Sequence, residues 1–192
     1  MSTPKKIAIT GLIGSGKTSV LNYLREKGYS VFSADEYVDN LYQNNKELAH
    51  QIQSFTTSDI LTNKTIDKEK LRKVFFTDKA LKEKTEAVVH QMVYEAIFND
   101  KIEATFYEVP LLFETNKQQS FDEVILVVTS KENQIKRLQE HRKMTLEAIK
   151  ERLMAQMSLQ SKMSQSDVLL INDSDLPHLY YQIDRYLERR GL

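Results

Sequence analysis

Three of the five glycines in this chain of 192 residues fall within six positions of one another, at Gly11, Gly14 and Gly16. Residues 11–18 fit the phosphate-binding pattern of a glycine, four arbitrary residues and then Gly-Lys-Ser/Thr. Such a loop turns its backbone N–H groups inward around a phosphate, which crowds any Cβ atom and therefore favours glycine. The residues predicted to bind a nucleotide here are Gly11, Gly14, Ser15, Gly16, Lys17, Thr18 and Ser19.

The last two residues of the pattern, Lys17 and Thr18, are the ones expected to bind the charged phosphates and the metal ion. Lys17 is expected to reach the β- and γ-phosphates of ATP, and the hydroxyl of Thr18 is expected to bind Mg²⁺. The helix that follows adds the positive end of its dipole. The chain has no cysteine, and its four histidines lack the spacing of metal ligands. We therefore expect no built-in metal site, and Mg²⁺ that arrives with the nucleotide.

The composition excludes several other classes of protein. Lys and Arg number 27 and Asp and Glu number 27, so a broadly basic surface for nucleic acid is not expected. Hydrophobic residues make up 41%, too many for a disordered chain, and the lack of cysteine excludes disulfide scaffolds. No apolar run approaches the length of about 18 residues that crosses a bilayer. We expect a cytoplasmic protein, monomeric or weakly homo-oligomeric, with neither a nucleic-acid nor a membrane partner.

Five short segments rich in β-branched and aromatic residues are predicted to be buried strands. They are residues 7–10, 29–32, 104–109, 124–129 and 168–171. Stretches with helical spacing separate them, beginning with a helix that Gly28 would close. This alternation favours a parallel α/β sheet, in which ligands bind at the carboxyl ends of the strands.

The gap of about seventy residues between the second and third strands is far longer than a crossover requires, so we expect an insertion there. It reads as nearly all helical, with Asp67 and Asp78 as N-caps of two helices. After the fourth strand two more helices are predicted, the later one starting near Thr145. The basic turn between them contains Arg142 and is either a cationic lid or a solvated hairpin. A last helix is predicted over residues 175–190.

Carboxylates follow the second and third strands, at the edge where a phosphate ligand would lie. Asp35 could accept the proton of an attacking hydroxyl or help to hold Mg²⁺, both of which phosphoryl transfer needs. It is equally well placed to be the N-cap of a helix starting at Glu36. Residues 108–114, Glu-Val-Pro-Leu-Leu-Phe-Glu, either line a substrate cleft or belong to the core, and their spacing does not decide between the two.

With these motifs, the chain resembles the dephospho-CoA kinases over nearly its whole length. The resemblance implies an enzyme that phosphorylates the ribose 3′-hydroxyl of dephospho-CoA with ATP, the last step of coenzyme A biosynthesis. Residues 109–114 are the most specific match. Ala34 and Asp35 match the end of the family's Asp-Ala-Asp, whose final residue is taken as the general base, and Arg142 falls in the lid region.

The resemblance also implies roles for individual residues. Asp35, Lys17 and Arg142 would be catalytic, and Asn172 would lie beside the adenine. The lid region is matched by Gln134, Arg137, Leu138, Arg142, Arg152 and Gln156. The expected acceptor-binding residues are Asp35, His90, Pro110, Leu111, Leu112, Phe113 and Glu114.

The implied architecture is the three-layer P-loop NTPase fold, an α/β fold with a five-stranded parallel sheet, a helical substrate subdomain and a helical lid. One kinase domain would span residues 1–192. Its core would comprise residues 1–35, 104–134 and 158–192, with the substrate-binding insertion at 36–103 and the lid at 135–157.

Four positions depart from the family pattern and bear on how the acceptor is bound. Ser33 replaces the first Asp, Asp39 stands where an Arg is common, Gln91 replaces a Pro, and Lys143 replaces an Asp. Two other interpretations remain open. One is a nucleoside or nucleoside-monophosphate kinase, which shares the loop, the acceptor domain and the lid. The other is a non-catalytic regulatory module in which ATP only orders the lid.

Overall fold

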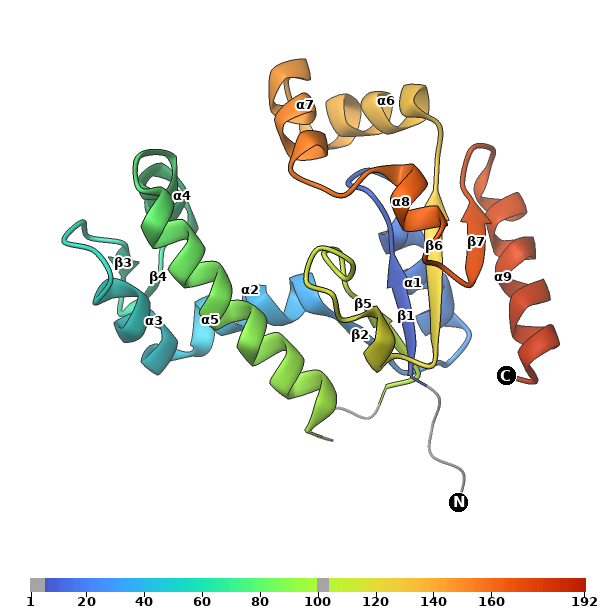
Figure 1. Ribbon diagram of the computed structural model, residues 1–192, viewed down its shortest axis with the longest axis horizontal. Coiled ribbons are helices and arrows are strands. Elements are labelled where there is room, and N and C mark those ends of the chain that lie inside the picture. The colour runs from blue at the N-terminus through green and yellow to red at the C-terminus, as the bar shows by residue number, and fades with distance from the viewer. Residues whose placement is uncertain (1–5, 100–103) are drawn as a thin grey trace. The chain divides into compact units, whose positions relative to one another are not determined.

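The computed structural model describes residues 6–99 and 104–192, and the chain divides into two compact units (Figure 1). The first comprises Met1–Ser33 with Ala104–Leu192, and the second comprises Ala34–Glu103. The first unit contains a large sheet and the predicted phosphate loop, whereas the second is mainly helical.

A five-stranded parallel sheet forms the centre of the first unit. Its strands are β1 (Ile7–Thr10), β2 (Val31–Ser33), β5 (Phe106–Glu108), β6 (Glu123–Val128) and β7 (Val168–Ile171). They lie in the order β2-β5-β1-β6-β7, so β1, which leads into the loop, is the central strand. The predicted α/β class is confirmed, and each of the five predicted segments overlaps one strand.

Two helices cover one face of this sheet. α1 (Lys17–Glu26) contributes Val20 and Leu24, and α9 (Leu176–Arg190) contributes Ile183 and Leu187, to a core with strand residues such as Ile9. Residues four positions apart lie on the same side of a helix, so each helix presents one apolar stripe to the sheet. The loop between β1 and α1 therefore joins two well-buried elements, which fix both of its ends.

Aromatic side chains pack on the opposite face. Tyr107 of β5 lies between Phe32 of β2 and Phe121, with ring centroids 6.0 and 5.8 Å apart, respectively. All three side chains are buried. Phe121 follows the short 3₁₀ helix η1 (Gln118–Ser120), so this cluster fixes the segment between β5 and β6 against the sheet.

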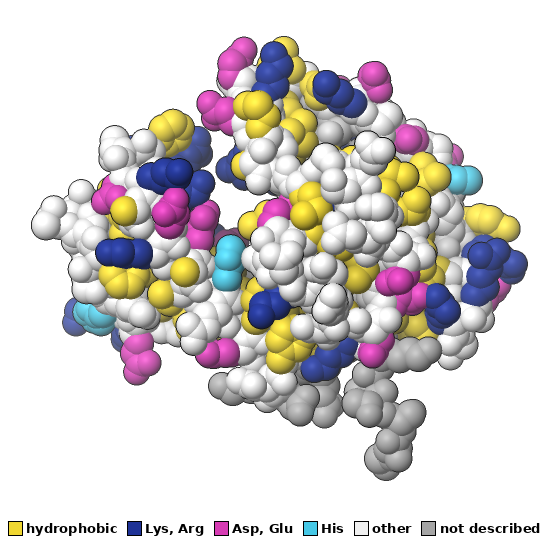
Figure 2. All heavy atoms as spheres, viewed as in Figure 1, with side chains coloured by type: hydrophobic (Ala, Val, Ile, Leu, Met, Phe, Trp, Pro, Cys, Tyr) yellow, Lys and Arg dark blue, Asp and Glu magenta, His cyan; other side chains and the backbone are white. Residues whose placement is uncertain are grey.

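Three helices connect β6 to β7. They are α6 (Lys131–Arg142), α7 (Leu146–Met154) and α8 (Leu159–Met163). Each begins after a residue whose hydroxyl oxygen accepts a backbone N–H from the first turn, namely Ser130, Thr145 and Ser158. The predicted helix start at Thr145 is therefore confirmed. Figure 2 shows charged side chains of both signs over α6 and α7.

The second unit is mainly helical and contains a small hairpin. Its elements are α2 (Ala34–Asn44), α3 (Lys46–Gln53), β3 (Leu61–Thr62), β4 (Thr65–Ile66), α4 (Lys68–Thr77) and α5 (Lys79–Phe98). Asp67 and Asp78 cap α4 and α5 as predicted. The Asp67 carboxylate accepts the N–H groups of Glu69 and Lys70, and the Asp78 carboxylate accepts the N–H of Leu81. None of the helices in the described residues is long and apolar enough to cross a bilayer.

The antiparallel pair β3–β4 corrects the expectation that this segment is nearly all helical. Its two turn residues, Asn63 and Lys64, both have positive φ, at 52° and 65°. A type I′ turn requires positive φ at both positions and most often uses Asn-Gly or Asp-Gly. The pair Asn-Lys therefore predicts a hairpin only weakly, although it forms one here.

The second strand of the large sheet begins later than predicted, at Val31 rather than Tyr29. Gly28, with φ of 90°, follows α1, and the Tyr29 N–H donates to the Leu24 carbonyl at 3.0 Å. This is the helix cap ending in glycine that the sequence predicts, but the last hydrogen bond of the cap is made by the N–H of Tyr29, one residue after Gly28. The chain can become extended only after the cap is complete.

Candidate active site

The predicted phosphate loop connects β1 to α1 at the carboxyl edge of the sheet. Gly16, with φ of 97°, directly precedes the first helical residue, Lys17. The Lys17 Nζ donates to the Gly11 carbonyl at 3.0 Å and to the Leu12 carbonyl at 3.4 Å, so the ammonium group is turned back toward the loop. Thr18 is exposed in the first turn. A cation, a hydroxyl and the N–H groups of a helix N-terminus therefore meet here, which suits an anionic phosphate.

Gly11 and Gly16 have no room for a side chain because other segments of the chain lie against them. A Cβ atom on Gly11 would lie 2.6 Å from the Val127 carbonyl oxygen and 2.6 Å from Ser15 Oγ. A Cβ atom on Gly16 would collide with the side-chain amide of Asn172. These glycines are therefore required by the close approach of neighbouring segments, in addition to the turning of the loop.

Gly16→Ala should be much more destabilising than Gly28→Ala, although the two glycines have nearly the same φ, 97° and 90°. Nothing lies within 4 Å of a Cβ atom on Gly28, so that variant carries only the strain of a left-handed alanine, about 1–2 kcal/mol. At Gly16 the displacement of Asn172 adds an overpacking cost of about 1–3 kcal/mol. Urea unfolding measures both losses, and equal losses would contradict the tight contact with Asn172.

Asn172 and Arg137 support the loop from the side of β7. Asn172 is 4% exposed, and its Nδ2 donates to the Ser15 carbonyl at 2.9 Å. Its backbone carbonyl accepts from Arg137 Nη2 at 2.8 Å and from the Thr129 hydroxyl at 3.0 Å. Arg137 is therefore held by the backbone around the loop, unlike a mobile lid cation. The expected position of Asn172 beside the adenine stays a prediction.

Asp173 joins this support to the start of α6. Its Oδ1 accepts the Ser130 N–H at 2.5 Å, the Thr129 hydroxyl at 3.0 Å and the Asn133 side-chain amide at 3.3 Å. These hydrogen bonds, chiefly that from the Ser130 N–H, hold the pKa of the carboxyl below its ordinary value, against a smaller opposing effect of desolvation. The loop following β7 is thus tied to the N-terminus of α6.

Asp173→Asn should lower the free energy of unfolding at pH 7 by about 0.5–1 kcal/mol, a small loss because the carboxyl is largely exposed to solvent. A lowered pKa stabilises the fold above the ordinary carboxyl pKa of about 3.9, and this contribution is lost as the pH falls through the lower value of the folded state. The difference between variant and wild type should therefore shrink in acid. Urea unfolding at neutral and acidic pH checks this, and a difference independent of pH would contradict it.

Ser33 and Glu108 end the neighbouring strands β2 and β5, and both are buried. Ser33 Oγ donates to Glu108 Oε2 at 2.7 Å. The family pattern has an Asp at position 33, which would place two carboxylates side by side and disfavour the ionisation of both. Ser33 instead gives Glu108 a neutral donor, so this departure from the family pattern is accommodated locally.

Residues 110–114 divide between the core and the surface. Leu112 is 0% and Phe113 is 1% exposed, so their side chains pack in the core. Pro110 and Leu111 are half-buried. The two side chains are closed off from solvent in this structure, and their expected contact with a substrate stays a prediction. Of these four side chains, only Pro110 and Leu111 remain accessible to an acceptor.

In the second unit, Asp35 is exposed in the first turn of α2. The helix already begins at Ala34, so the alternative in which Asp35 caps a helix starting at Glu36 is wrong. One turn later, Asp39 pairs with Lys68 Nζ at 2.5 Å. The carboxylate that departs from the family pattern therefore has a cationic partner.

His90 and Gln91 lie in the middle of α5. His90 is half-buried, and the exposed Gln91 donates from Nε2 to Glu95 Oε1 at 2.8 Å. A proline at position 91, as in the family pattern, has no N–H for the helix and its ring clashes with the preceding turn. Gln91 allows α5 to continue unbroken through 20 residues.

The basic turn between α6 and α7 is exposed. Arg142 is the last residue of α6, and His141, Arg142 and Lys143 are all exposed. Lys143 has φ of 51°, and its N–H donates to the Leu138 carbonyl, which ends the helix with a left-handed cap. The three basic side chains are therefore carried at the turn, accessible to an anion.

Two contributors near the loop were missed by sequence reasoning, Lys162 and Asp173. Lys162 is fully buried and paired with Glu114. Asp173 makes the contacts to Ser130 given above. Lysine is rarely buried, and both interactions join residues more than forty positions apart. No local pattern in the sequence marks either residue.

The fold and the loop define a class of protein. A glycine-rich loop follows the central strand of a five-stranded parallel sheet and is closed by Lys17 and Thr18 at the start of a helix. This is the phosphate-binding arrangement of the P-loop kinases.

Comparison with known proteins identifies the family within this class. The sequence model of the dephospho-CoA kinase family matches residues 5–178. A dephospho-CoA kinase of Streptococcus mutans is 33% identical over 192 residues, covering 96% of this chain and 97% of that protein. The crystal structure of TT1252 from Thermus thermophilus is similar with a TM-score of 0.80, 28% identity and 98% coverage of both chains. For the dephospho-CoA kinase from Campylobacter jejuni the TM-score is 0.68, at 25% identity, covering 97% of this chain and 98% of that one. The chain belongs to the dephospho-CoA kinase family.

Proposed function

We propose that this protein transfers the γ-phosphoryl group of ATP to the ribose 3′-hydroxyl of dephospho-CoA, forming coenzyme A and ADP. The observation that carries the proposal is the complete phosphate loop, with Lys17 and Thr18 at the start of α1, in a chain of this family. The reaction would take place in the cytoplasm, in a monomer or weak homo-oligomer. The domain organisation would be the one expected from the sequence, with the substrate-binding insertion at residues 36–103 and the lid at 135–157.

Asp35 is the proposed general base. In the transfer, the ribose oxygen forms a bond to the γ-phosphorus while the bond from that phosphorus to the bridging oxygen breaks, and ADP leaves. The carboxylate of Asp35 accepts the hydroxyl proton as the new bond forms. Its exposure in the first turn of α2 supports this role, because an acceptor must reach it. His90, Pro110 and Leu111 are proposed to contact the rest of the acceptor.

The proposed cofactor is Mg²⁺ carried by ATP. The exposed hydroxyl of Thr18 offers one oxygen ligand, and no group of three or more His, Asp or Glu in the described residues could hold a metal without the nucleotide. This donor set fits an ion that takes most of its oxygens from phosphates and water. When bound, the ion supplies neutralisation of charge on the phosphates.

Arg142 is the proposed lid residue. It is exposed at the turn between α6 and α7, with His141 and Lys143 beside it. A guanidinium group brought over the transferred phosphoryl group stabilises its charge, and closure of the lid excludes the water that would hydrolyse ATP. Asn172 is proposed to act on the nucleotide chiefly through the loop, because its side chain is bonded to the Ser15 carbonyl.

Purified protein incubated with Mg-ATP and a panel of acceptors tests this function. The panel contains dephospho-CoA, common nucleosides and nucleoside monophosphates, and phosphorylated products are detected by mass spectrometry. We expect coenzyme A from dephospho-CoA, with one ADP formed for each product molecule. A phosphorylated nucleoside or nucleotide in its place would contradict the proposal. Binding of ATP without any product would favour a regulatory module.

A further inference from the structure

One residue of the phosphate loop, Ile13, is bound on both sides by glutamine side chains. Its N–H donates to Gln156 Oε1 at 3.0 Å, and its carbonyl accepts from Gln134 Nε2 at 2.5 Å. Gln134 lies in the first turn of α6, and Gln156 lies two residues after the end of α7. Both ends of the segment that contains α6 and α7 are therefore hydrogen-bonded to the same residue of the loop.

Packing reinforces the contact with α6. A Cβ atom on Gly14 would lie 2.9 Å from Leu138 Cγ and 3.3 Å from Gln134 Cγ, so α6 lies directly against the loop backbone. Leu138 is 1% exposed. The part of α6 that carries Gln134 and Leu138 thus belongs to the surroundings of the loop, whereas its end at Arg142 is exposed.

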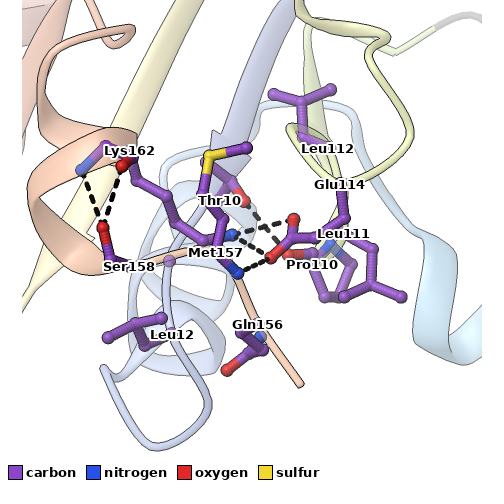
Figure 3. A network of polar contacts seen from close by, with 12 residues as sticks. Thr10, Leu12, Pro110, Leu111, Leu112, Glu114, Gln156, Met157, Ser158 and Lys162 are labelled. Carbon is purple, nitrogen blue, oxygen red and sulfur yellow. Dashed lines mark hydrogen bonds and ion pairs between the residues drawn. The ribbon is translucent and has the colours of Figure 1, made fainter. Parts of the chain in front are cut away.

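An ion pair between a fully buried lysine and a half-buried glutamate holds the residue that follows Gln156. The Met157 N–H donates to Glu114 Oε1 at 2.8 Å, and Lys162 Nζ lies 2.8 Å from Oε1 and 3.0 Å from Oε2 of the same carboxylate (Figure 3). The Lys162 side chain is 0% exposed, and its Nζ lies 5.5 Å from the centroid of the Phe113 ring. Removing one partner of such a pair leaves an uncompensated buried charge, which is strongly unfavourable. Glu114 therefore fixes Met157, and with it the backbone that carries Gln156.

These contacts also explain why the last residue of the Pro-Leu-Leu-Phe-Glu string is a carboxylate. Both oxygens of Glu114 are engaged, one by the Met157 N–H and both by Lys162. A carboxylate in this state binds the chain itself and is not presented to an acceptor. We therefore assign Glu114 a positioning role, and its expected contact with a substrate stays a prediction.

We propose that Gln134 and Gln156 are positioning residues that couple the phosphate loop to the lid, and that the pair of Glu114 and Lys162 holds Gln156 in place. Phosphates that enter the loop accept hydrogen bonds from its N–H groups. Any accompanying movement of Ile13 is passed through Gln134 and Gln156 to both ends of the lid, residues 135–157, at once. Nucleotide binding thereby orders the lid that carries Arg142. The inference rests on the proposed function for the identity of the nucleotide.

Hydrogen exchange tests the coupling without any acceptor. We expect Mg²⁺ with the non-hydrolysable ATP analogue AMP-PNP to slow amide exchange in the loop, residues 11–18, and in the lid, residues 135–157, of the wild-type protein. In Gln156→Ala, AMP-PNP should still slow amide exchange in the loop. In the lid, the slowing by AMP-PNP should be about fivefold smaller than in the wild type, because one hydrogen bond contributes about 1 kcal/mol. Gln160→Ala removes an exposed glutamine of α8 and is the matched control, with the wild-type pattern expected.

The outcomes separate positioning from a merely structural role. A Gln156→Ala variant that melts earlier but keeps full protection of its lid by AMP-PNP overturns the inference. The same loss of lid protection in Gln160→Ala also overturns it. A wild-type protein that protects its lid with AMP-PNP but does not phosphorylate dephospho-CoA supports the coupling and contradicts the proposed function.

A pair of variants tests the anchor at Glu114. Glu114→Gln keeps an amide oxygen for the Met157 N–H but leaves Lys162 without its counter-charge, so the melting temperature should fall steeply. Adding Lys162→Met removes the unpaired charge, and the double variant should recover much of the melting temperature and keep the AMP-PNP protection of the lid. A double variant no more stable than Glu114→Gln, or one without that protection, overturns the anchoring role.

Discussion

Asp35→Asn is expected to lower kcat for phosphorylation of dephospho-CoA by roughly 10²–10⁴-fold, the usual contribution of a general acid–base group. The asparagine amide cannot accept the hydroxyl proton, so the ribose oxygen must attack without losing it to the protein. Affinity for ATP should change little, because the phosphates are assigned to the loop around Lys17. Steady-state kinetics with both substrates varied, together with calorimetric titration of AMP-PNP, measure the two effects separately.

Glu36→Gln is the matched control for this substitution. Glu36 is the next residue, also exposed and also in the first turn of α2. Each variant removes one negative charge near the positive end of the helix, which costs about 0.3–1 kcal/mol of stability. Only Asp35→Asn should lose turnover. Weaker ATP binding with unchanged kcat in that variant would be incompatible with Asp35 as the base.

The elements that could be predicted from the sequence are those determined by local chemistry. The phosphate loop is marked by its own glycines, and the caps Asp67, Asp78 and Thr145 each act on the turn that follows them. Buried parallel strands are recognisable because their residues are apolar on both faces. The β3–β4 hairpin was missed because its turn at Asn63 uses a pair of residues without glycine.

The parts of the site that could not be predicted depend on contacts between distant segments. Whether Leu112 and Phe113 line a cleft or pack in the core is decided by the aromatic and apolar side chains around them, and the core prevails. The same holds for Gln156, whose partner Ile13 lies 143 positions away. A glutamine has no preferred location that its sequence neighbours reveal, so the link between loop and lid emerges only from the fold.

The departures from the family pattern are explained in similar terms. Ser33 and Gln91 replace residues that would have created local difficulties in this chain, a second carboxylate beside Glu108 and an interruption of α5. Asp39 has Lys68 as its partner, a residue 29 positions later that spacing alone does not select. The family resemblance therefore identified the class of reaction, while the compensation for these three departures required the structure.

Lys17→Met should weaken the binding of AMP-PNP and lower kcat by roughly 10²–10³-fold, the loss expected when one donor to developing charge is removed from a preorganised site. The Lys17 ammonium group donates hydrogen bonds to the carbonyls of Gly11 and Leu12, and losing them should cost the fold no more than about 1–3 kcal/mol. Lys27→Met, just past the other end of α1, removes a surface lysine paired with Asp184 and should leave kinetics unchanged. The phosphates of a bound nucleotide repel one another in a site that excludes water, so the ammonium group should stabilise the nucleotide complex more than it stabilises the fold. Wild-type kinetics in Lys17→Met would separate the loop from phosphoryl transfer altogether.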